Sequence, residues 1–404
     1  FRAGVNAGNS IESGGNYNVA VGDEAGTAIT TADNNTLIGY AAGDALTTGS
    51  HNTFVGQNAG TATTGSNNTG IGRHALTANT SGVNTAVGYT ALDANTTGTS
   101  NVAVGDAALG GNVAGDQSVA IGTEALLAQN PSGNADMNNV AVGYRSGYAV
   151  TTGVQNTLIG SLAGDANTTG DQNTAVGFNA LTTNTTADSN TAVGYNSMAA
   201  TTTGASNVAV GGNALDANTE GASNVAVGWN SMTTTTTSSE NTAVGQSSLG
   251  LNTTGGQNVA VGKSALGANT TGTLNTAVGQ GAMSLLTTAS QNTAVGRGAL
   301  AAVTTTGQHT AMGDQALNAC TTGENNTAFG AQAAAATTSG KENVAIGAYA
   351  LDANTDGDQN TAVGMQALGS NTTADNCTAV GHDALAANTE GFNNTAVGSF
   401  AMDA

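Results

Sequence analysis

The sequence has little of what a compact globular enzyme is built from. Its 404 residues include a single proline, 3% aromatic residues and 8% charged residues, whereas charged residues make up about a quarter of an ordinary soluble domain. Large side chains are therefore too few to fill a thick core. The 39% of hydrophobic residues are largely Ala, Val and Leu, so any core must be thin and made of small side chains.

Basic residues are also scarce. Six Lys and Arg stand against 26 Asp and Glu, which gives a formal net charge of -20. Nucleic acids and anionic membranes attract clustered positive charge, so we expect neither as a partner. No apolar run approaches the roughly 20 residues of a membrane helix, and membrane insertion is not expected.

Glycine, in contrast, is abundant and regularly spaced. A glycine follows a short apolar triplet at positions 22, 39, 56, 72, 88, 105, 122, 143, 160 and onward to 398; of the 22 intervals between these 23 glycines, 19 are 17 residues long. We call them the coil glycines. A fixed short period is typical of a solenoid. The sequence therefore predicts an all-β parallel β-solenoid, or β-roll, of about 23 coils with a 17-residue period.

The repeat defines the expected organisation of the chain. Residues 1–15 precede it, and we expect an irregular segment or a partial first coil there, followed by a continuous solenoid over 16–404. Two intervals are 16 residues long, and the interval from Gly122 to Gly143 is 21 residues and contains Pro131. Four extra residues in one coil predict an insertion loop near 127–138.

The triplet before each coil glycine alternates in character, which indicates a strand. Its first position is Thr or Val in every repeat, and its third is almost always Val or Ile. We expect these β-branched residues to face the coil centre, opposite a Leu row that follows the glycine. The predicted core includes Val87, Val104, Val176, Val193, Leu92 and Leu181. Glycines replace the Leu at positions 26, 43 and 60, which predicts thinner first coils.

The middle of the triplet is nearly always Ala, and on a strand it lies on the opposite face. A row exposed to solvent would tolerate polar residues, so a persistent small residue suggests close packing against another chain. We expect Ala86, Ala175 and Ala243 to lie in an interface between copies of this chain.

Each coil closes with a turn such as Asn-Thr-Thr-Gly, in which Asn and Gly suit the turn backbone. Many of these turns match the Asn-x-Ser/Thr pattern of glycosylation acceptors. The possible acceptors are Asn79, Asn95, Asn167, Asn184, Asn252, Asn269 and Asn371. A turn written Asn-Thr-Thr also produces this match without any modification.

The consensus NTAVGxxALxxNTTG resembles the head repeats of trimeric autotransporter adhesins, whose motif runs much like NSVAIGxxA. It also resembles 17-residue repeats of bacterial and phage fibre proteins. The resemblance covers the chain from about residue 16 to its end. It implies a left-handed parallel β-roll in which three chains pack side by side into a homotrimeric rod, and it implies an extracellular fibre or adhesin.

Catalytic chemistry finds no support in the sequence. The four His residues occupy unrelated places in the repeat, and no phosphate loop, nucleophile elbow or zinc motif is present. Cys320 and Cys377 stand between three and four coils apart, roughly 16 Å at about 4.8 Å per layer, which is beyond disulfide reach. We expect buried or free thiols there, with pairing between chains as the alternative. Neither enzyme activity nor a cofactor or metal is expected.

The leading hypothesis is therefore an extracellular structural fibre segment, an adhesin head or appendage shaft on a cell surface. A phage tail fibre on a virion surface is the alternative, and an ice-binding or glycan-binding solenoid is a minor one. The expected partner is the chain itself, as a homotrimer that could also join end to end into a filament. A cell-surface or glycan receptor is a further possible partner.

Overall fold

The computed structural model describes residues 1–11 and 14–403. It is an all-β parallel β-solenoid of about 23 coils with a 17-residue period, and its described residues form no helix. The coils group into two compact units, Phe1–Ala205 and Ser206–Ala404. Residues 12 and 13 of the expected N-terminal segment, and Ala404, lie outside the described residues.

The first unit is a stack of three-residue strands, each of which pairs in parallel with the next. In register, for example, Thr174 lies beside Thr191 and Ala175 beside Ala192. The strand β1 (Arg2–Ala3) pairs with β2 in the same way, so residues 1–3 follow the path of a coil. The other strands of this stack are β2 (Val19–Val21), β3 (Thr36–Ile38), β4 (Thr53–Val55), β5 (Thr69–Ile71), β6 (Thr85–Val87), β7 (Val102–Val104), β9 (Val119–Ile121), β11 (Val140–Val142), β12 (Thr157–Ile159), β13 (Thr174–Val176) and β14 (Thr191–Val193).

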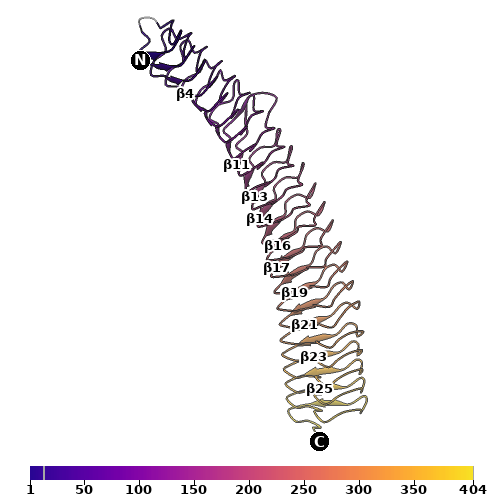
Figure 1. The fold of residues 1–404 in the computed structure, drawn as a ribbon. Coiled ribbons are helices and arrows are strands. Elements are labelled where there is room, and N and C mark those ends of the chain that lie inside the picture. Colours follow the sequence, from indigo (N-terminus) through magenta and orange to yellow (C-terminus); the bar gives the residue numbers. More distant parts are fainter. Residues whose placement is uncertain (12–13, 404) are drawn as a thin grey trace. The chain divides into compact units, whose positions relative to one another are not determined.

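The second unit repeats the arrangement. Figure 1 shows β16, β17, β19, β21, β23 and β25 following one another along this unit, and each strand pairs in parallel and in register with the next. The strands are β15 (Val208–Val210), β16 (Val225–Val227), β17 (Thr242–Val244), β18 (Val259–Val261), β19 (Thr276–Val278), β20 (Thr293–Val295), β21 (Thr310–Met312), β22 (Thr327–Phe329), β23 (Val344–Ile346), β24 (Thr361–Val363), β25 (Thr378–Val380) and β26 (Thr395–Val397).

The 21-residue interval forms a loop where the sequence predicted one. Residues 132–134 are exposed, and the chain then returns to the stack as the short strand β10 (Ala135–Asp136). This strand pairs in parallel with β8 (Gly115–Asp116) of the preceding coil. On both sides of the loop the main stack is intact, because β9 pairs directly with β11.

The coil glycine ends each strand with a backbone conformation that other residues avoid. Gly143, for example, has φ +139°, and a Cβ placed on it would lie 2.5 Å from the carbonyl oxygen of Gly160 in the next coil. The glycine is thus required both by its positive φ and by the close approach of stacked backbones.

The interior of each coil combines a thin apolar part with two rows of asparagine. The apolar part contains the middle strand residue and an Ala-Leu pair, as in Ala175, Ala180 and Leu181, all completely buried. The asparagines form ladders between coils: the Asn173 backbone N–H donates to Asn156 Oδ1 at 2.9 Å, and Asn173 Nδ2 donates to the Ala187 carbonyl at 2.9 Å. These bonds satisfy buried amides that would otherwise be costly to desolvate.

In three coils a large residue occupies the middle strand position and a glycine occupies the position usually held by Leu. Where the middle strand residue is Leu158, the position usually held by Leu is Gly164, and a Cβ on that glycine would lie 2.8 Å from Leu158 Cδ2. The pairs Leu37 with Gly43 and Phe54 with Gly60 follow the same rule, and both large side chains are completely buried. The prediction of thinner coils at Gly43 and Gly60 was therefore wrong, because the strand supplies the missing volume.

Candidate functional site

The most extensive candidate surface is the side of the strands that points away from the coil interior. We call it the outward face, and it consists of the first and third residues of β2–β7, β9 and β11–β26. These residues are partly exposed on almost every strand; Ile159 is 39% exposed and Phe329 is 52% exposed. The face therefore presents Thr and Val beside Val and Ile, coil after coil.

The sequence-based assignment of the two strand faces was wrong. Ala86, Ala175 and Ala243, expected in a chain interface, are completely buried inside their own coils. The residues expected in the core, Val87, Val104, Val176 and Val193, lie on the outward face and are only half-buried. The reason is the narrow interior: the Leu row opposite already fills it, so the strand can add only a methyl group. Leu92 and Leu181 are completely buried, as predicted.

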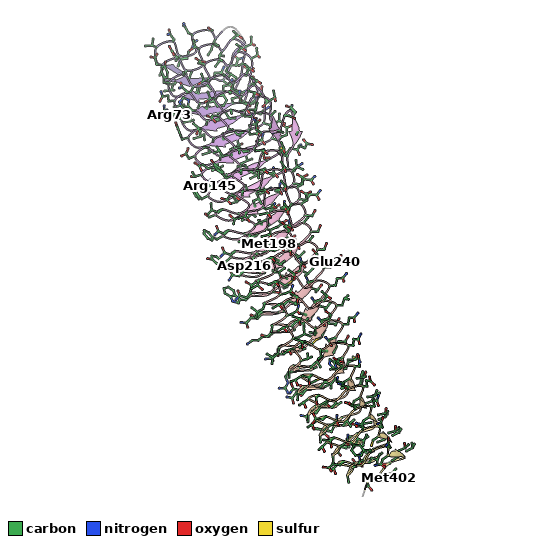
Figure 2. All side chains as sticks on the ribbon, turned by 90° about the vertical axis from the view of Figure 1, so that its right-hand side faces the viewer. Arg73, Arg145, Met198, Asp216, Glu240 and Met402 are labelled. Carbon is green, nitrogen blue, oxygen red and sulfur yellow. The ribbon has the colours of Figure 1, made fainter. Side chains whose placement is uncertain are left out.

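Charge is absent from the outward face. Neither outward position carries Asp, Glu, Lys, Arg or His in any of these strands, although the chain has a net charge of -20. Charged side chains occupy other sides of the coil; in the second unit, Asp216 and Glu240 lie toward opposite edges of the view (Figure 2). An uncharged β-branched surface can be desolvated without removing a charge from water and without bringing like charges together.

An aromatic row borders the outward face, immediately after the coil glycine. Six of the 14 aromatic residues occupy this one position, and each is about half exposed: Tyr40, Tyr89, Tyr144, Phe178, Tyr195 and Trp229. Phe178 and Tyr195 stack with ring centroids 5.8 Å apart and planes 11° apart. Counting aromatics by repeat position would have revealed this row from the sequence.

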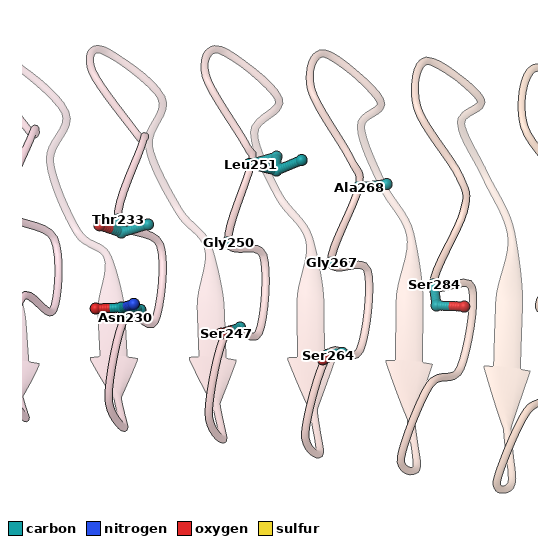
Figure 3. A pocket seen from close by; sticks show the side chains of 9 residues that line it. All are labelled: Asn230, Thr233, Ser247, Gly250, Leu251, Ser264, Gly267, Ala268 and Ser284. Atoms are coloured by element: carbon teal, nitrogen blue, oxygen red, sulfur yellow. The ribbon is translucent and has the colours of Figure 1, made fainter.

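A shallow groove of about 430 Å³ crosses several coils of the second unit. Figure 3 shows its base at Gly250 and Gly267, where the neighbouring coils carry Thr233 and Ser284 instead. Leu251, which is 53% exposed, lines one side, and hydroxyl groups line the other. The remaining lining residues are Asn230, Ser247, Ser264 and Ala268, so the groove is uncharged.

The seven asparagines considered as glycosylation acceptors are all completely buried. They belong to an interior ladder: Asn269 Nδ2 donates to Asn252 Oδ1 at 2.8 Å and to the Gly272 carbonyl at 3.1 Å. A glycan on such an amide would break these bonds and has no space. The prediction of glycosylation is therefore wrong for Asn79, Asn95, Asn167, Asn184, Asn252, Asn269 and Asn371 in the folded chain.

One coil replaces both ladder asparagines with residues that can titrate. His309 accepts the Asn326 backbone N–H at Nδ1, 3.3 Å away, and its Nε2 lies 3.0 Å from the Gly323 carbonyl. These partners require a neutral ring with the proton on Nε2. Cys320 Sγ lies 3.9 Å from the same Nε2. Burial lowers the pKa of His309, although the Gly323 carbonyl and Glu324 oppose this shift, and burial raises the pKa of the Cys320 thiol to about 11.

Both cysteines are structural replacements for asparagine. Cys320 and Cys377 are free thiols and completely buried, which confirms that they do not pair with each other. Cys377 occupies the ladder position of its coil, where its backbone N–H donates to Asn360 Oδ1 at 2.9 Å.

We expect the His309 coil to lose stability in mild acid. The folded-state pKa of His309 is lowered from its ordinary value of 6.5, so the unfolded chain takes up the proton first. The contribution of neutral His309 to the free energy of unfolding is complete above pH 6.5 and is lost as pH falls from there through the folded-state pKa. Glu324 and Cys320 are the other titratable groups that face this ring.

Hydrogen exchange of the Asn326 amide, measured between pH 7.5 and 5.5 and corrected for intrinsic exchange, reports this loss. The control is His309→Asn, which restores the residue of the neighbouring ladder positions. Protection should fall with pH in the original chain only. Equal pH dependence in both proteins would contradict the assignment.

The described residues place no group of three or more His, Cys, Asp or Glu where they could hold a metal ion. Nor do residues 1–11 and 14–403 contain a helix that is long and apolar enough to cross a membrane. No protein-family model matches the chain, and no curated protein matches it.

Proposed function

We propose that this chain is an extracellular structural fibre segment, an adhesin head or appendage shaft, in which three copies pack side by side through the outward face. The observation that carries the proposal is the uncharged β-branched surface present on the strands of both units. Soluble monomers rarely expose a continuous apolar patch larger than a few hundred Å². Burying this face against further copies would remove it from water, while the acidic residues elsewhere remain solvated.

The resemblance to adhesin heads and fibre repeats supports three copies, an extracellular or virion-surface location and the phage tail fibre as the alternative. The groove at Gly250 and Gly267 supports a possible contact with an uncharged receptor group, because hydroxyl and aliphatic side chains line it. Enzyme activity has no comparable support. The proposed role is to extend and present a surface rather than to perform a reaction.

The mass of the purified protein in solution, measured by light scattering, tests the assembly. The proposal expects about three times the chain mass of 38.9 kDa. The double substitution Val176→Asp and Val193→Asp should shift the protein to single chains, because it places like charges from three copies within a desolvated face.

The matched control is Thr169→Asp with Thr186→Asp, which adds the same charge on exposed turns of the same unit. Acidic residues already occupy the equivalent turn position at Glu220 and Glu390, so this variant should assemble normally. A mass of 38.9 kDa for the unsubstituted chain, or equal masses for the two variants, would overturn the proposed interface.

A second candidate, ice binding, is favoured by one observation. The threonines of the strands point outward and not into the core; over β19–β22 the four threonines at the first strand position follow one another in register. Regular outward hydroxyl and methyl groups can order water at one strand spacing. Thermal hysteresis in a single-chain protein would support this role, whereas a trimer without hysteresis would leave only the fibre proposal.

A further inference from the structure

Exposed asparagines share one corner of the coil, five residues before the coil glycine, and five of the six open an Asn-x-Thr triplet; Asn138 does not. We call Asn34, Asn67, Asn325, Asn376 and Asn393 the corner asparagines. Each opens an Asn-x-Thr triplet, in the form Asn-Asn-Thr or Asn-Cys-Thr. Glu240, which occupies the same position of another coil, projects at the edge of the second unit (Figure 2).

The local backbone holds both functional groups of the triplet on the outside. Each corner asparagine has a left-handed φ between 57° and 62°, a conformation that Asn tolerates well. In four of the five triplets the middle residue turns inward: Asn35, Asn68, Asn326 and Cys377 are at most 1% exposed, whereas Asn394 in the last coil is half-buried. The following Thr belongs to the outward face. In the single chain, before other copies cover the outward face, the amide and the hydroxyl that an acceptor sequence requires are therefore both presented to solvent.

The corner amides are also free of the ladder that constrains the interior asparagines. Among the described residues, no side-chain hydrogen bond involves Asn325, Asn376 or Asn393. The backbones of the last two are anchored, because the Asn376 N–H donates to the Asp358 carbonyl at 3.0 Å and the Asn393 N–H to the Asp375 carbonyl at 3.1 Å. A substituent on Nδ2 of these three residues would therefore displace no partner, whereas Asn34 Nδ2 lies 3.4 Å from His51 Nε2. The seven buried asparagines of the turns lack this freedom.

We infer that the corner asparagines are the acceptors of N-linked oligosaccharide in the folded chain, an inference that rests on the proposed extracellular location. The donor is an oligosaccharide linked to a lipid pyrophosphate. The Asn Nδ2 forms a bond to the anomeric carbon as the bond from that carbon to the pyrophosphate oxygen breaks. The amide gives up one proton to a base of the transferring enzyme, and the lipid pyrophosphate leaves as the anion.

The spacing of the sites adds a constraint. Asn376 and Asn393 lie 17 residues apart, hence in neighbouring coils, about 4.8 Å apart along the stack. Two oligosaccharides at this separation would collide near their attachment points. We therefore expect only one of these two sites to be occupied in any one chain, while Asn325 is modified independently.

The test is to secrete the chain from a eukaryotic cell line and to map the glycans of the folded, secreted protein. Peptide-N-glycosidase converts each occupied Asn to Asp, so peptide masses identify the sites. Glycans should appear on corner asparagines and on none of the seven buried asparagines. Occupancy of buried sites in folded protein, or no occupancy of the corner sites, would overturn the inference.

Two variants serve as matched controls. Thr327→Val removes the acceptor triplet of Asn325 but keeps a residue that other strands carry at this position, so one glycan should be lost without unfolding. Thr271→Glu removes the triplet of buried Asn269 and places the residue found at Glu220 in another turn; it should leave the glycan mass unchanged.

Poor secretion does not leave the question open, because folded unmodified protein can be treated with a soluble asparagine glucosyltransferase and a nucleotide-linked glucose. Addition at the corner asparagines only is the expected result. The mass of unmodified protein is measured separately. If the unsubstituted protein is a trimer and the single-chain variant Val176→Asp with Val193→Asp accepts no glucose, this inference alone is overturned; an unsubstituted protein that is a modified single chain would overturn the assembly alone.

Discussion

Replacing Ala175 with Glu is expected to unfold the coil around β13. Ala175 is completely buried in the coil interior, beside Ala192 of the next strand. A carboxylate there has neither a partner nor room, so the expected loss in the free energy of unfolding is about 4 kcal/mol or more. Amide hydrogen exchange should show lost protection in this coil and its two neighbours, because each coil contacts only adjacent coils.

The neighbouring residue provides the comparison. Val176 lies on the outward face, so Val176→Asp should keep the coil folded as a single chain and act on assembly. Thr169→Glu adds charge on an exposed turn and should change neither property. If Val176→Asp abolished protection in this coil while Ala175→Glu preserved it, the two strand faces would have to be exchanged.

Replacing Gly143 with Ala is expected to disrupt stacking at the end of β11. The added Cβ would lie 2.5 Å from the Gly160 carbonyl oxygen and 2.6 Å from its carbon, at φ +139°. Both atoms belong to the backbone of the next coil, so neither can move aside without breaking the ladder. Strain and displacement together should cost about 3 kcal/mol or more.

Gly133→Ala is the matched control, ten residues earlier in the insertion loop. A Cβ at this position would meet nothing within 4 Å, so the change should be neutral or slightly stabilising. Thermal and denaturant unfolding of the two variants distinguishes the cases. Equal stability would show that the coil glycines are not required for stacking.

Much of the architecture could be predicted without coordinates. The spacing of the coil glycines predicted the parallel strands, the number of coils and the insertion loop, because one coil cannot bury its interior without the next. The Leu row and the buried cysteines were also predicted correctly. Alternation of residue types showed that each strand has two distinct faces.

Alternation alone could not show which of the two strand faces points into the coil. A preference for placing the larger β-branched residue inside is reasonable in a thick core, but it failed for Val87, Val104, Val176 and Val193. The distance between the strand and the opposite Leu row determines how large the inward strand residue can be. That distance is set only when the coil closes. The coil that carries Leu158 on its strand carries Gly164 at the usual Leu position, and a Cβ on that glycine would lie 2.8 Å from Leu158 Cδ2. The coil interior therefore has room for only one of the two large side chains.

Closure of the coil also determines which acceptor sequences are buried and which are exposed. Asn269 and Asn325 both begin Asn-x-Thr triplets, and no local pattern assigns one to the interior and the other to the surface. The sequence by itself determined that this protein is a stack of similar coils with an uncharged, repetitive strand. Only the tertiary structure decided which side chains the coil encloses, because the closed coil has room for one large side chain, either the Leu after the coil glycine or a large middle strand residue, and the first and third strand residues then point outward.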